Sequence, residues 1–282
     1  MKVVFPEIFT TYEEIAKLPG KVRSLYEDLG IKIRQGGDLE KHLKLCSGLD
    51  EKTKMEPEKY LLDVSRAKRV LETILACEDE EEIKENLKRI AEHSLKTNTD
   101  RPSLGKDSLF ELELLQYMKH RGLKARLGEP DIVIEVPFGE YYIACKTINS
   151  LKNFEKQLSS GCKQINMYGK GCIAFNLEPH TLVDEPVEAY DMKDAGLKLE
   201  ILIKDIISKK KYLLINKLID NSFDGVIFQM TCVVKFKNSA SNLDTFTYSY
   251  YFNNTQCQEN EASDRFGSLV ESMKGEYVNY IS

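Results

Sequence analysis

Two short runs of β-branched and aromatic residues, joined by a turn, constrain the fold of this chain more than any other feature. Residues 132–136 (Ile-Val-Ile-Glu-Val) and 141–145 (Tyr-Tyr-Ile-Ala-Cys) flank the tetrapeptide Pro137-Phe138-Gly139-Glu140. Short β-rich runs around a turn that contains proline and glycine are typical of a β-hairpin. We therefore expect an antiparallel pair of strands in the middle of the chain.

The segments on either side of this hairpin predict an α/β core. A helix is expected over residues 107–120, and Gly122 follows it as a plausible C-cap. After the hairpin, residues 150–168 indicate a second helix, and residues 172–177 form a short apolar run typical of a buried strand. The predicted order is helix, β-meander, helix, strand.

The rest of the chain predicts helices before this core and mixed structure after it. Thr11 and Glu14 form a capping-box pattern, residues 57–77 have helical apolar spacing, and the acidic run 78–82 would complement the dipole of the helix that follows it. In the tail we expect a long helix, two strands and an amphipathic helix, over residues 197–219, 225–236, 245–252 and 263–277. This tail could extend the sheet or form a lid, and the sequence leaves both open.

A turn-rich stretch at residues 97–103 predicts a boundary between regions. We accordingly expect a helical N-terminal region (1–98), a core (99–182) and a mixed α+β C-terminal region (183–282) that can extend the core. The seven cysteines are odd in number and none is paired at C-x2-C spacing, so zinc knuckles and disulfide frameworks are disfavoured. We interpret the cysteines as reduced, small core residues.

Composition excludes some classes of partner. The chain has 282 residues, of which 42% are hydrophobic and 30% charged, with a formal net charge of −5. No apolar run approaches the roughly 20 residues of a membrane helix, and the N-terminus lacks a signal-peptide pattern. We therefore expect a cytoplasmic protein without a membrane partner. The negative charge excludes a generally basic coat for nucleic acid but not a local basic groove.

Three polar residues are placed so that they could meet. Asp131 directly precedes the first strand of the hairpin and Lys146 directly follows the second. Those positions are neighbours in an antiparallel pair. On the preceding helix, Glu111 shares a face with apolar residues three, four and seven positions further on, whereas Glu113 is expected to be more exposed. A carboxylate on an apolar face needs a cation or a hydrogen-bond donor, so Glu111 is the expected inward acid.

Glu111, Asp131 and Lys146 belong to a segment, residues 105–178, that resembles the PD-(D/E)xK nuclease superfamily. The segment Gly105 to Glu111 resembles the G-x-x-x-x-F-E entry helix of Mrr-like members, Pro130-Asp131 the first half of the signature, and Cys145-Lys146 its end. Gln164 and Tyr168 match the Q-x3-Y motif of RecB-type members. The resemblance implies a restriction-endonuclease-like αβββαβ core.

It also implies a metal-dependent nuclease that hydrolyses DNA, in a role such as restriction or phage defence. Mg²⁺ (or Mn²⁺) would be held by Glu111, Asp131 and the carbonyl of Cys145, and Lys146 would supply a positive charge beside the attacking water. Gln164 and Tyr168 would complete the site from the second helix.

One departure leaves the activity open. The acidic residue that the family has two positions before the lysine is Ala144 here, and alanine cannot bind metal. The carboxylate could have migrated to the next helix, where Glu155 is the candidate. Alternatively, Glu111, Asp131 and the Cys145 carbonyl could suffice. In a third account the site is degenerate, and the protein only binds nucleic acid or a protein partner.

A structural subunit is a further alternative, with the N-terminal helices as the docking surface for a protein partner or a homo-oligomer. A nuclease needs at least one basic set along the path of the phosphates. Three sets are candidates, although solvated faces would explain each of them equally well: Lys119, Arg121, Lys124 and Arg126; Lys152, Lys156 and Lys163; and Lys209, Lys210 and Lys211.

Overall fold

The fold is seen in a computed structural model, which describes residues 11–97, 101–137, 139–181, 185–237, 243–253 and 260–279. Within these residues seven strands form one mixed sheet in the order β1-β2-β3-β4-β6-β5, and β7 pairs with the other edge of β6. The strands are β1 (Ala125–Leu127), β2 (Ile132–Val136), β3 (Gly139–Thr147), β4 (Gly171–Asn176), β5 (Val187–Ala189), β6 (Val226–Phe236) and β7 (Leu243–Phe252).

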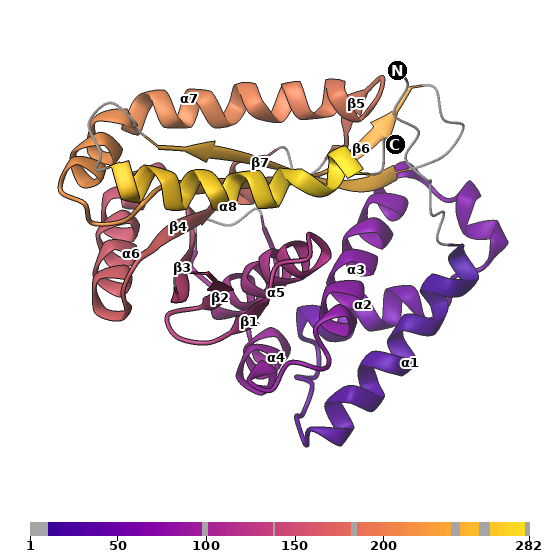
Figure 1. The fold of residues 1–282 in the computed structure, drawn as a ribbon. Coiled ribbons are helices and arrows are strands. Elements are labelled where there is room, and N and C mark those ends of the chain that lie inside the picture. The colour runs from indigo at the N-terminus through magenta and orange to yellow at the C-terminus, as the bar shows by residue number, and fades with distance from the viewer. Residues whose placement is uncertain are drawn as a thin grey trace.

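Helices surround this sheet (Figure 1). They are α1 (Tyr12–Asp28), α2 (Asp38–Cys46), α3 (Glu58–Ala76), α4 (Ile83–Glu92), α5 (Leu104–His120), α6 (Phe154–Tyr168), α7 (Met192–Ile219) and α8 (Asn260–Asn279), with short 3-10 turns η1 (Glu51–Met55), η2 (Leu151–Asn153) and η3 (Glu178–His180). Among the described residues, no helix combines the length and the apolar character that crossing a lipid bilayer requires.

The predicted α/β core is confirmed. From α5 to β4 the elements follow the order α-β-β-β-α-β. Strand β3 pairs antiparallel with β2, where Ile132 faces Ile143, and parallel with β4, where Lys146 faces Phe175. Gly122 follows α5 with a φ of 76°, as expected of a C-cap glycine. The sequence did not predict α2, β1 or β5.

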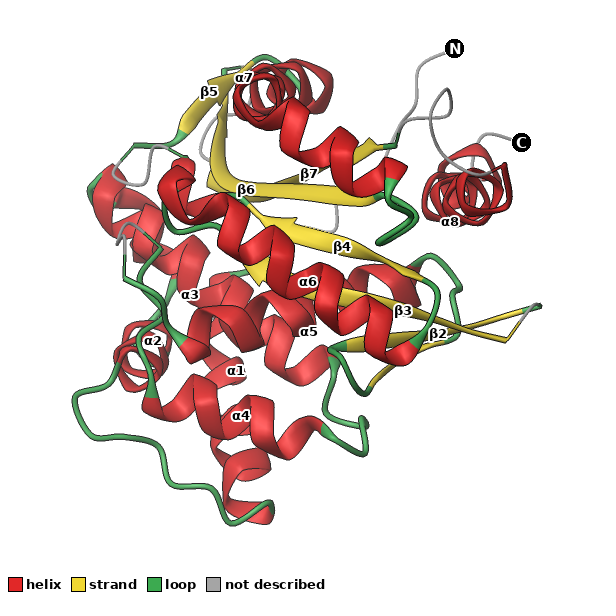
Figure 2. Ribbon diagram, turned by 90° about the vertical axis from the view of Figure 1, so that its left-hand side faces the viewer, coloured by secondary structure: helices red, strands yellow, loops and turns green. Residues whose placement is uncertain are grey.

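The sheet has two covered faces, and each strand alternates between them. On β3, Tyr141, Ile143 and Cys145 join the apolar cluster that contains α5 and the N-terminal helices, and we call this side the α5 face. Ala144 joins the cluster that contains α6 and α7, which we call the α6 face. Figure 2 shows α6 crossing the strands on the side opposite α5. The period-two alternation of a strand therefore sends neighbouring residues of β3 into different cores.

The C-terminal region extends the sheet, which resolves the alternative left open above. Strand β6 continues the sheet beyond β4 in parallel register, and β7 pairs antiparallel with β6 from Val226 to Lys235. The long helix α7 covers the α6 face, and α8 runs beside β7 (Figure 1). Ile227 of β6 belongs to the same α5-face cluster as Phe266, Leu269 and Met273 of α8.

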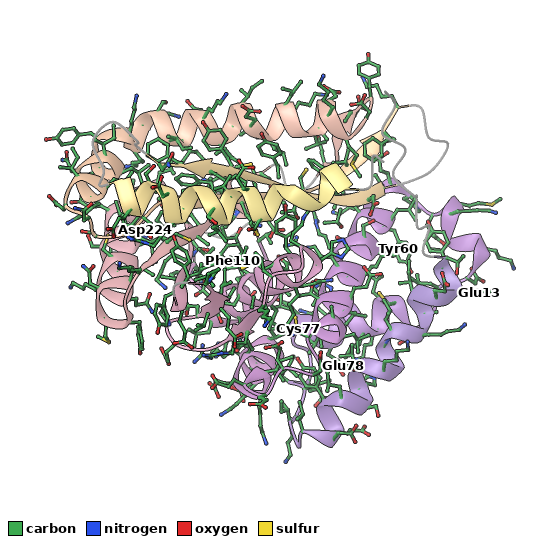
Figure 3. The ribbon with its side chains drawn as sticks, in the orientation of Figure 1. Glu13, Tyr60, Cys77, Glu78, Phe110 and Asp224 are labelled. Carbon is green, nitrogen blue, oxygen red and sulfur yellow. The ribbon has the colours of Figure 1, made fainter. Side chains whose placement is uncertain are left out.

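Two interactions hold α8 against the sheet. The Arg265 guanidinium donates two hydrogen bonds of 2.8 Å to the carboxylate of Asp224, which is labelled in Figure 3. Next to Asp224, Gly225 packs so closely on the ring of Phe266 that a Cβ atom there would lie 2.4 Å from it. Position 225 therefore has to be glycine for α8 to dock as it does.

The acidic run before α4 has a structural role that the sequence did not predict. It lies in a turn outside the helix, and Glu82 at the N-cap makes no side-chain capping bond. Glu80 is buried instead, where it accepts the backbone N–H of Leu127 at 3.2 Å and pairs with Lys119. This carboxylate ties the N-terminal helices to β1. The run also ends at the N-cap of α4, where its charges are placed to complement the helix dipole as predicted.

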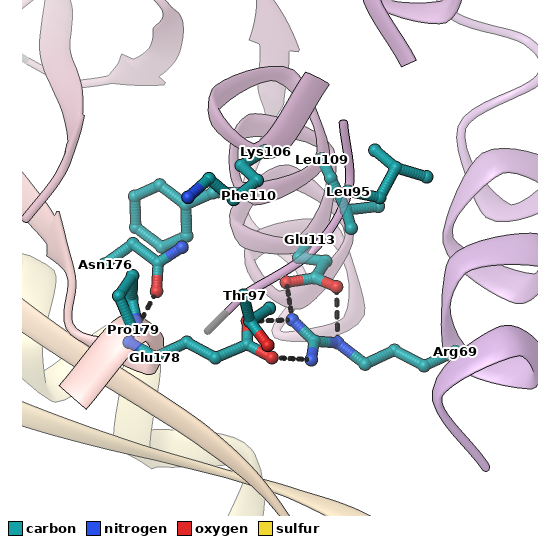
Figure 4. Close-up of a pocket in the computed structure, with 10 residues that line it drawn as sticks. All are labelled: Arg69, Leu95, Thr97, Lys106, Leu109, Phe110, Glu113, Asn176, Glu178 and Pro179. Carbon is teal, nitrogen blue, oxygen red and sulfur yellow. Dashed lines mark hydrogen bonds and ion pairs between the residues drawn. The ribbon is translucent and has the colours of Figure 1, made fainter. Parts of the chain in front are cut away.

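A buried arginine joins three elements on the α5 face. The Arg69 guanidinium of α3 forms paired hydrogen bonds to Glu113 of α5 (2.5 and 2.7 Å) and to Glu178 of η3 (2.6 and 2.7 Å), as Figure 4 shows. All three side chains are at most 15% exposed. Glu113 is more exposed than Glu111, as predicted, but it is still largely shielded from water, and Arg69 supplies its counter-charge. The six described cysteines are free and buried, as predicted, and Cys257 lies outside the described residues.

We expect Arg69→Met to lower the free energy of unfolding by about 3–5 kcal/mol, because it leaves two buried carboxylates without their cation. Urea denaturation followed by circular dichroism measures this. Lys59→Met, at an exposed position of the same helix, is the matched control and should change stability by less than about 0.5 kcal/mol. Equal effects of the two variants would contradict the assigned role of Arg69.

Two Gly→Ala substitutions test the docking of α8. Gly225→Ala should destabilise the protein by about 1–3 kcal/mol, because the new methyl group overlaps the Phe266 ring. Gly267→Ala lies within α8 where nothing is within 4 Å, and it should stabilise by up to about 1 kcal/mol through helix propensity. Thermal unfolding measures both. A neutral Gly225→Ala variant would mean that α8 does not pack in this position.

Candidate active site

Strand β3 extends beyond the first residue of β2, which faces Ile143. An ion pair lies along this part of β3, which has no partner in β2. Here the Cys145 N–H donates to Asp131 Oδ2 at 2.6 Å, while Lys146 Nζ lies 3.4 Å from that oxygen and donates to the Cys145 carbonyl at 2.7 Å. The side chains of Asp131 and Lys146 are each 13% exposed. Both backbone groups of Cys145 are thus satisfied by side chains. The predicted meeting of Asp131 and Lys146 is what the structure shows.

Glu111 approaches the same place from α5. Its side chain is buried, and its Oε2 accepts a hydrogen bond of 2.6 Å from Asn86 of α4. Burial, followed by the negative charge of Asp131, raises the pKa of Glu111 to about 8. The expected inward orientation of Glu111 is confirmed, and the two carboxylates lie within electrostatic reach of each other.

The pKa of Asp131 is also raised, to about 6, and the cause is again burial. The ammonium of Lys146 and the hydrogen bond from Cys145 act in the opposite direction but do not cancel it. In the absence of a bound cation Glu111 therefore keeps its proton near neutral pH, and the charge that Lys146 balances is that of Asp131. A desolvated acidic pair with one nearby lysine is an arrangement in which functional sites are often found.

Sequence reasoning missed a further acid on α5. Asp107 lies one helical turn before Glu111, and burial raises its pKa while Lys146 and Lys106 lower it. The neighbouring Lys106 is buried, and its Nζ donates to the side chain of Asn149 at 2.6 Å. The i, i+4 spacing from Glu111 was the signal that could have identified Asp107.

The Q-x3-Y helix lies over the residues that precede Asp131. The Tyr168 hydroxyl donates to Glu129 Oε2 at 3.3 Å, and its ring packs near Tyr142 with centroids 6.0 Å apart. The charge of Asp131 contributes, after burial and Glu129, to a raised pKa of Tyr168. Gln164 is half-buried, and its Oε1 has no hydrogen-bond partner within the described residues.

Ala144 stands where the related nucleases have an acidic residue, and Glu155 was the candidate to replace that acid. Both lie apart from the centre. Ala144 is fully buried on the α6 face, in the cluster that contains Phe154 and Leu158, so its surroundings are hydrocarbon. Glu155 lies in the first turn of α6 with its side chain exposed. No hydrogen bond or ion pair joins it to the centre in the described part of the chain. Its neighbour Phe154 is the residue that α6 turns inward.

The oxygen donors of the centre suit a hard divalent cation in kind, although they are few. Glu111 Oε2 and Asp131 Oδ2 are held by Asn86 and Cys145, while the second oxygen of each carboxylate accepts no hydrogen bond from the described residues. The Cys145 carbonyl is a third oxygen. Mg²⁺ and Mn²⁺ prefer such ligands. No group of three or more His, Cys, Asp or Glu residues is arranged for a metal within the described ranges.

The basic sets lie away from this centre. Lys119, Lys124 and Arg126 are paired with Glu80, Glu135 and Glu140, and Lys209 is paired with Asp205. The set of Lys152, Lys156 and Lys163 is exposed and forms no ion pair with described residues, but α6 buries Phe154 and Leu158 on its opposite side. Lys156 and Lys163 therefore lie on the face of α6 that is turned away from the sheet, and Lys152 lies in η2, before this helix.

A pocket lies beside Arg69 rather than at the centre. It is a small pocket that is partly open to solvent, and it is shown in Figure 4. Its lining includes Lys106, Phe110, Glu113, Asn176 and Glu178. Since the Arg69 guanidinium is already bonded to both glutamates, the pocket offers no free cation from that residue.

No protein-family model matches the sequence, and no curated protein matches it either. The likeness to nucleases therefore rests on the residues themselves and on where the fold places them.

The raised pKa values predict a pH dependence of stability in metal-free buffer. A carboxyl group whose pKa is higher in the folded state binds its proton more tightly there, so stability falls as pH rises from the unfolded value of about 4 toward the folded value. For Glu111 that window ends near pH 8. Glu111→Gln should flatten the decline between pH 5 and pH 8 (roughly the interval between those two values), because the amide cannot ionise.

Urea denaturation at several pH values in the presence of a chelator measures this slope. Glu155→Gln removes an exposed carboxylate and should leave the slope unchanged. A wild-type protein whose stability is flat across the window, or rises with pH, would contradict the assigned environment of Glu111.

Proposed function

We propose that this protein is a metal-dependent nuclease that acts on DNA in the cytoplasm, in a role such as restriction or phage defence. The main support for this proposal is the cluster of Glu111, Asp131 and Lys146 at the edge of β3. Asp131 and Lys146, fifteen positions apart in sequence, lie 3.4 Å apart, and Glu111 reaches the same centre from the helix before the hairpin. The resemblance to PD-(D/E)xK nucleases assigns the same three positions to catalysis.

In this proposal Glu111, Asp131 and the Cys145 carbonyl hold the cation. When bound, the ion would lower the pKa of a water molecule and neutralise charge on the phosphate. Lys146 contributes a positive charge to the phosphate as negative charge builds up on it. Asn86 orients Glu111 through a 2.6 Å hydrogen bond, and the Cys145 N–H orients Asp131. Tyr168 holds Glu129, which precedes Asp131 by two positions.

A second candidate is nucleic-acid binding without cleavage. It is favoured by Ala144, because the position where the related enzymes carry an acid is surrounded by apolar residues here. It is also favoured by the Cys145 carbonyl, which Lys146 already occupies. In that case affinity for DNA should still fall with salt, because lysine–phosphate contacts release counterions.

Cleavage of supercoiled plasmid with Mg²⁺ or Mn²⁺ separates the two candidates. Asp131→Asn should reduce the rate by about 100-fold or more, because it removes a charged group at the reacting centre. Glu155→Gln should retain activity, since the exposed Glu155 side chain forms no hydrogen bond or ion pair with the centre among the described residues. Loss of activity in Glu155→Gln at the level of Asp131→Asn would instead favour a migrated carboxylate. A wild-type protein that binds DNA in a salt-dependent manner but never cleaves it would support the second candidate.

A further inference from the structure

The ammonium of Lys146 lies between two oxygens that would attract any cation. Its Nζ lies between Asp131 Oδ2, at 3.4 Å, and the Cys145 carbonyl, at 2.7 Å. Asp131 Oδ2 belongs to a carboxylate, and the Cys145 oxygen is the negative end of a carbonyl dipole. Both are oxygens of the kind that bind divalent cations. With 13% of each side chain exposed, Lys146 and Asp131 are largely shielded from water, so their attraction is screened less than that of a surface pair.

The other basic side chains near the centre, Lys106 and Arg89, bind groups other than Asp131. Lys106 Nζ donates to the side chain of Asn149 and to the carbonyl of Arg101. Arg89 is partly exposed and donates to Glu85, one turn earlier on α4. Among the hydrogen bonds and ion pairs of the described residues, Asp131 is bonded by one side-chain cation, Lys146.

We propose that Lys146 is the resident cation of this centre, held on the two oxygens that a divalent ion would take, so that the ion and the ammonium compete for Asp131 and the Cys145 carbonyl. This inference rests on the proposed function and deepens it, because it assigns Lys146 a role before catalysis as well as during it. Without an ion, Lys146 keeps Asp131 paired. When an ion binds, the ammonium has to leave those oxygens.

The side chain is suited to such a movement. A lysine carries its charge on four rotatable carbons, and its donors are not fixed in a plane as those of arginine are. Lys146 stands at a strand end on the edge of β3, not in the middle of a packed face. Once displaced, the ammonium would be available to a phosphate of the substrate. If the ammonium and a divalent ion were both bound to Asp131 and the Cys145 carbonyl, their positive charges would be close enough to repel each other strongly.

Isothermal titration calorimetry with Mn²⁺ on the metal-stripped full chain tests the competition. Lys146→Met removes the charge and keeps much of the length, and it should bind Mn²⁺ at least 10-fold more tightly than the wild type. Lys146→Arg retains a cation and should show no such gain. Lys152→Met removes an exposed lysine of η2 that forms no ion pair with described residues and should leave the affinity unchanged. If Lys146→Met does not fold, as judged by circular dichroism, Lys146→Gln is the second neutral variant, with the same expected gain.

The possible failures are distinguishable. If wild-type protein binds Mn²⁺ through Asp131, as shown by loss of binding in Asp131→Asn, but the neutral Lys146 variants bind no more tightly, the competition is overturned and the proposed metal site survives. If neither the wild type nor the neutral variants bind Mn²⁺, both proposals fail. A gain in affinity that persists in the double variant Asp131→Asn/Lys146→Met would also overturn the competition, because the ion would then be bound elsewhere.

Discussion

The hydrogen bond between Asp131 and the backbone of Cys145 is the interaction on which the centre depends. Strand β2 begins at Ile132, opposite Ile143, so β3 continues past the end of its antiparallel partner. A backbone N–H left unpaired in a largely buried position is costly. Asp131 provides the acceptor that the missing strand residue would have supplied. The same requirement that completes the sheet therefore fixes a carboxylate at its edge.

The position of this edge explains how residues from both faces of the sheet can meet. Lys146 lies two residues after Ala144 and so starts from the α6 face, whereas Glu111 comes from the α5 face. Within the sheet these faces are separated by backbone. At the edge, Lys146 can turn around Cys145 to reach Asp131, and burial then raises the pKa of both acids. The electrostatic properties of the centre are a consequence of where β2 begins.

The sequence was sufficient for features that depend on local pattern. The hairpin, the helices on both sides and the meeting of Asp131 with Lys146 follow from strand alternation, turn residues and antiparallel geometry. It was insufficient where a distant partner decides the outcome. Glu113 and Glu80 are acids whose partners, Arg69 and Lys119, are brought to them only by the packing of the N-terminal helices. The spacing of Asp107 from Glu111 places both acids on one face of α5, but the approach of Lys146 to Asp107 appears only when α5 packs on the sheet.

The central claim is that Glu111, Asp131 and the Cys145 carbonyl form a cation site from which Lys146 is displaced. Crystals soaked in Mn²⁺ and measured at the manganese absorption edge would test it most directly. The account predicts an anomalous peak in contact with oxygens of Glu111, Asp131 and Cys145, with Lys146 Nζ moved off the Cys145 carbonyl. The claim would be contradicted by a map without a peak there, or by a peak elsewhere while Lys146 remains bonded to Asp131 and Cys145.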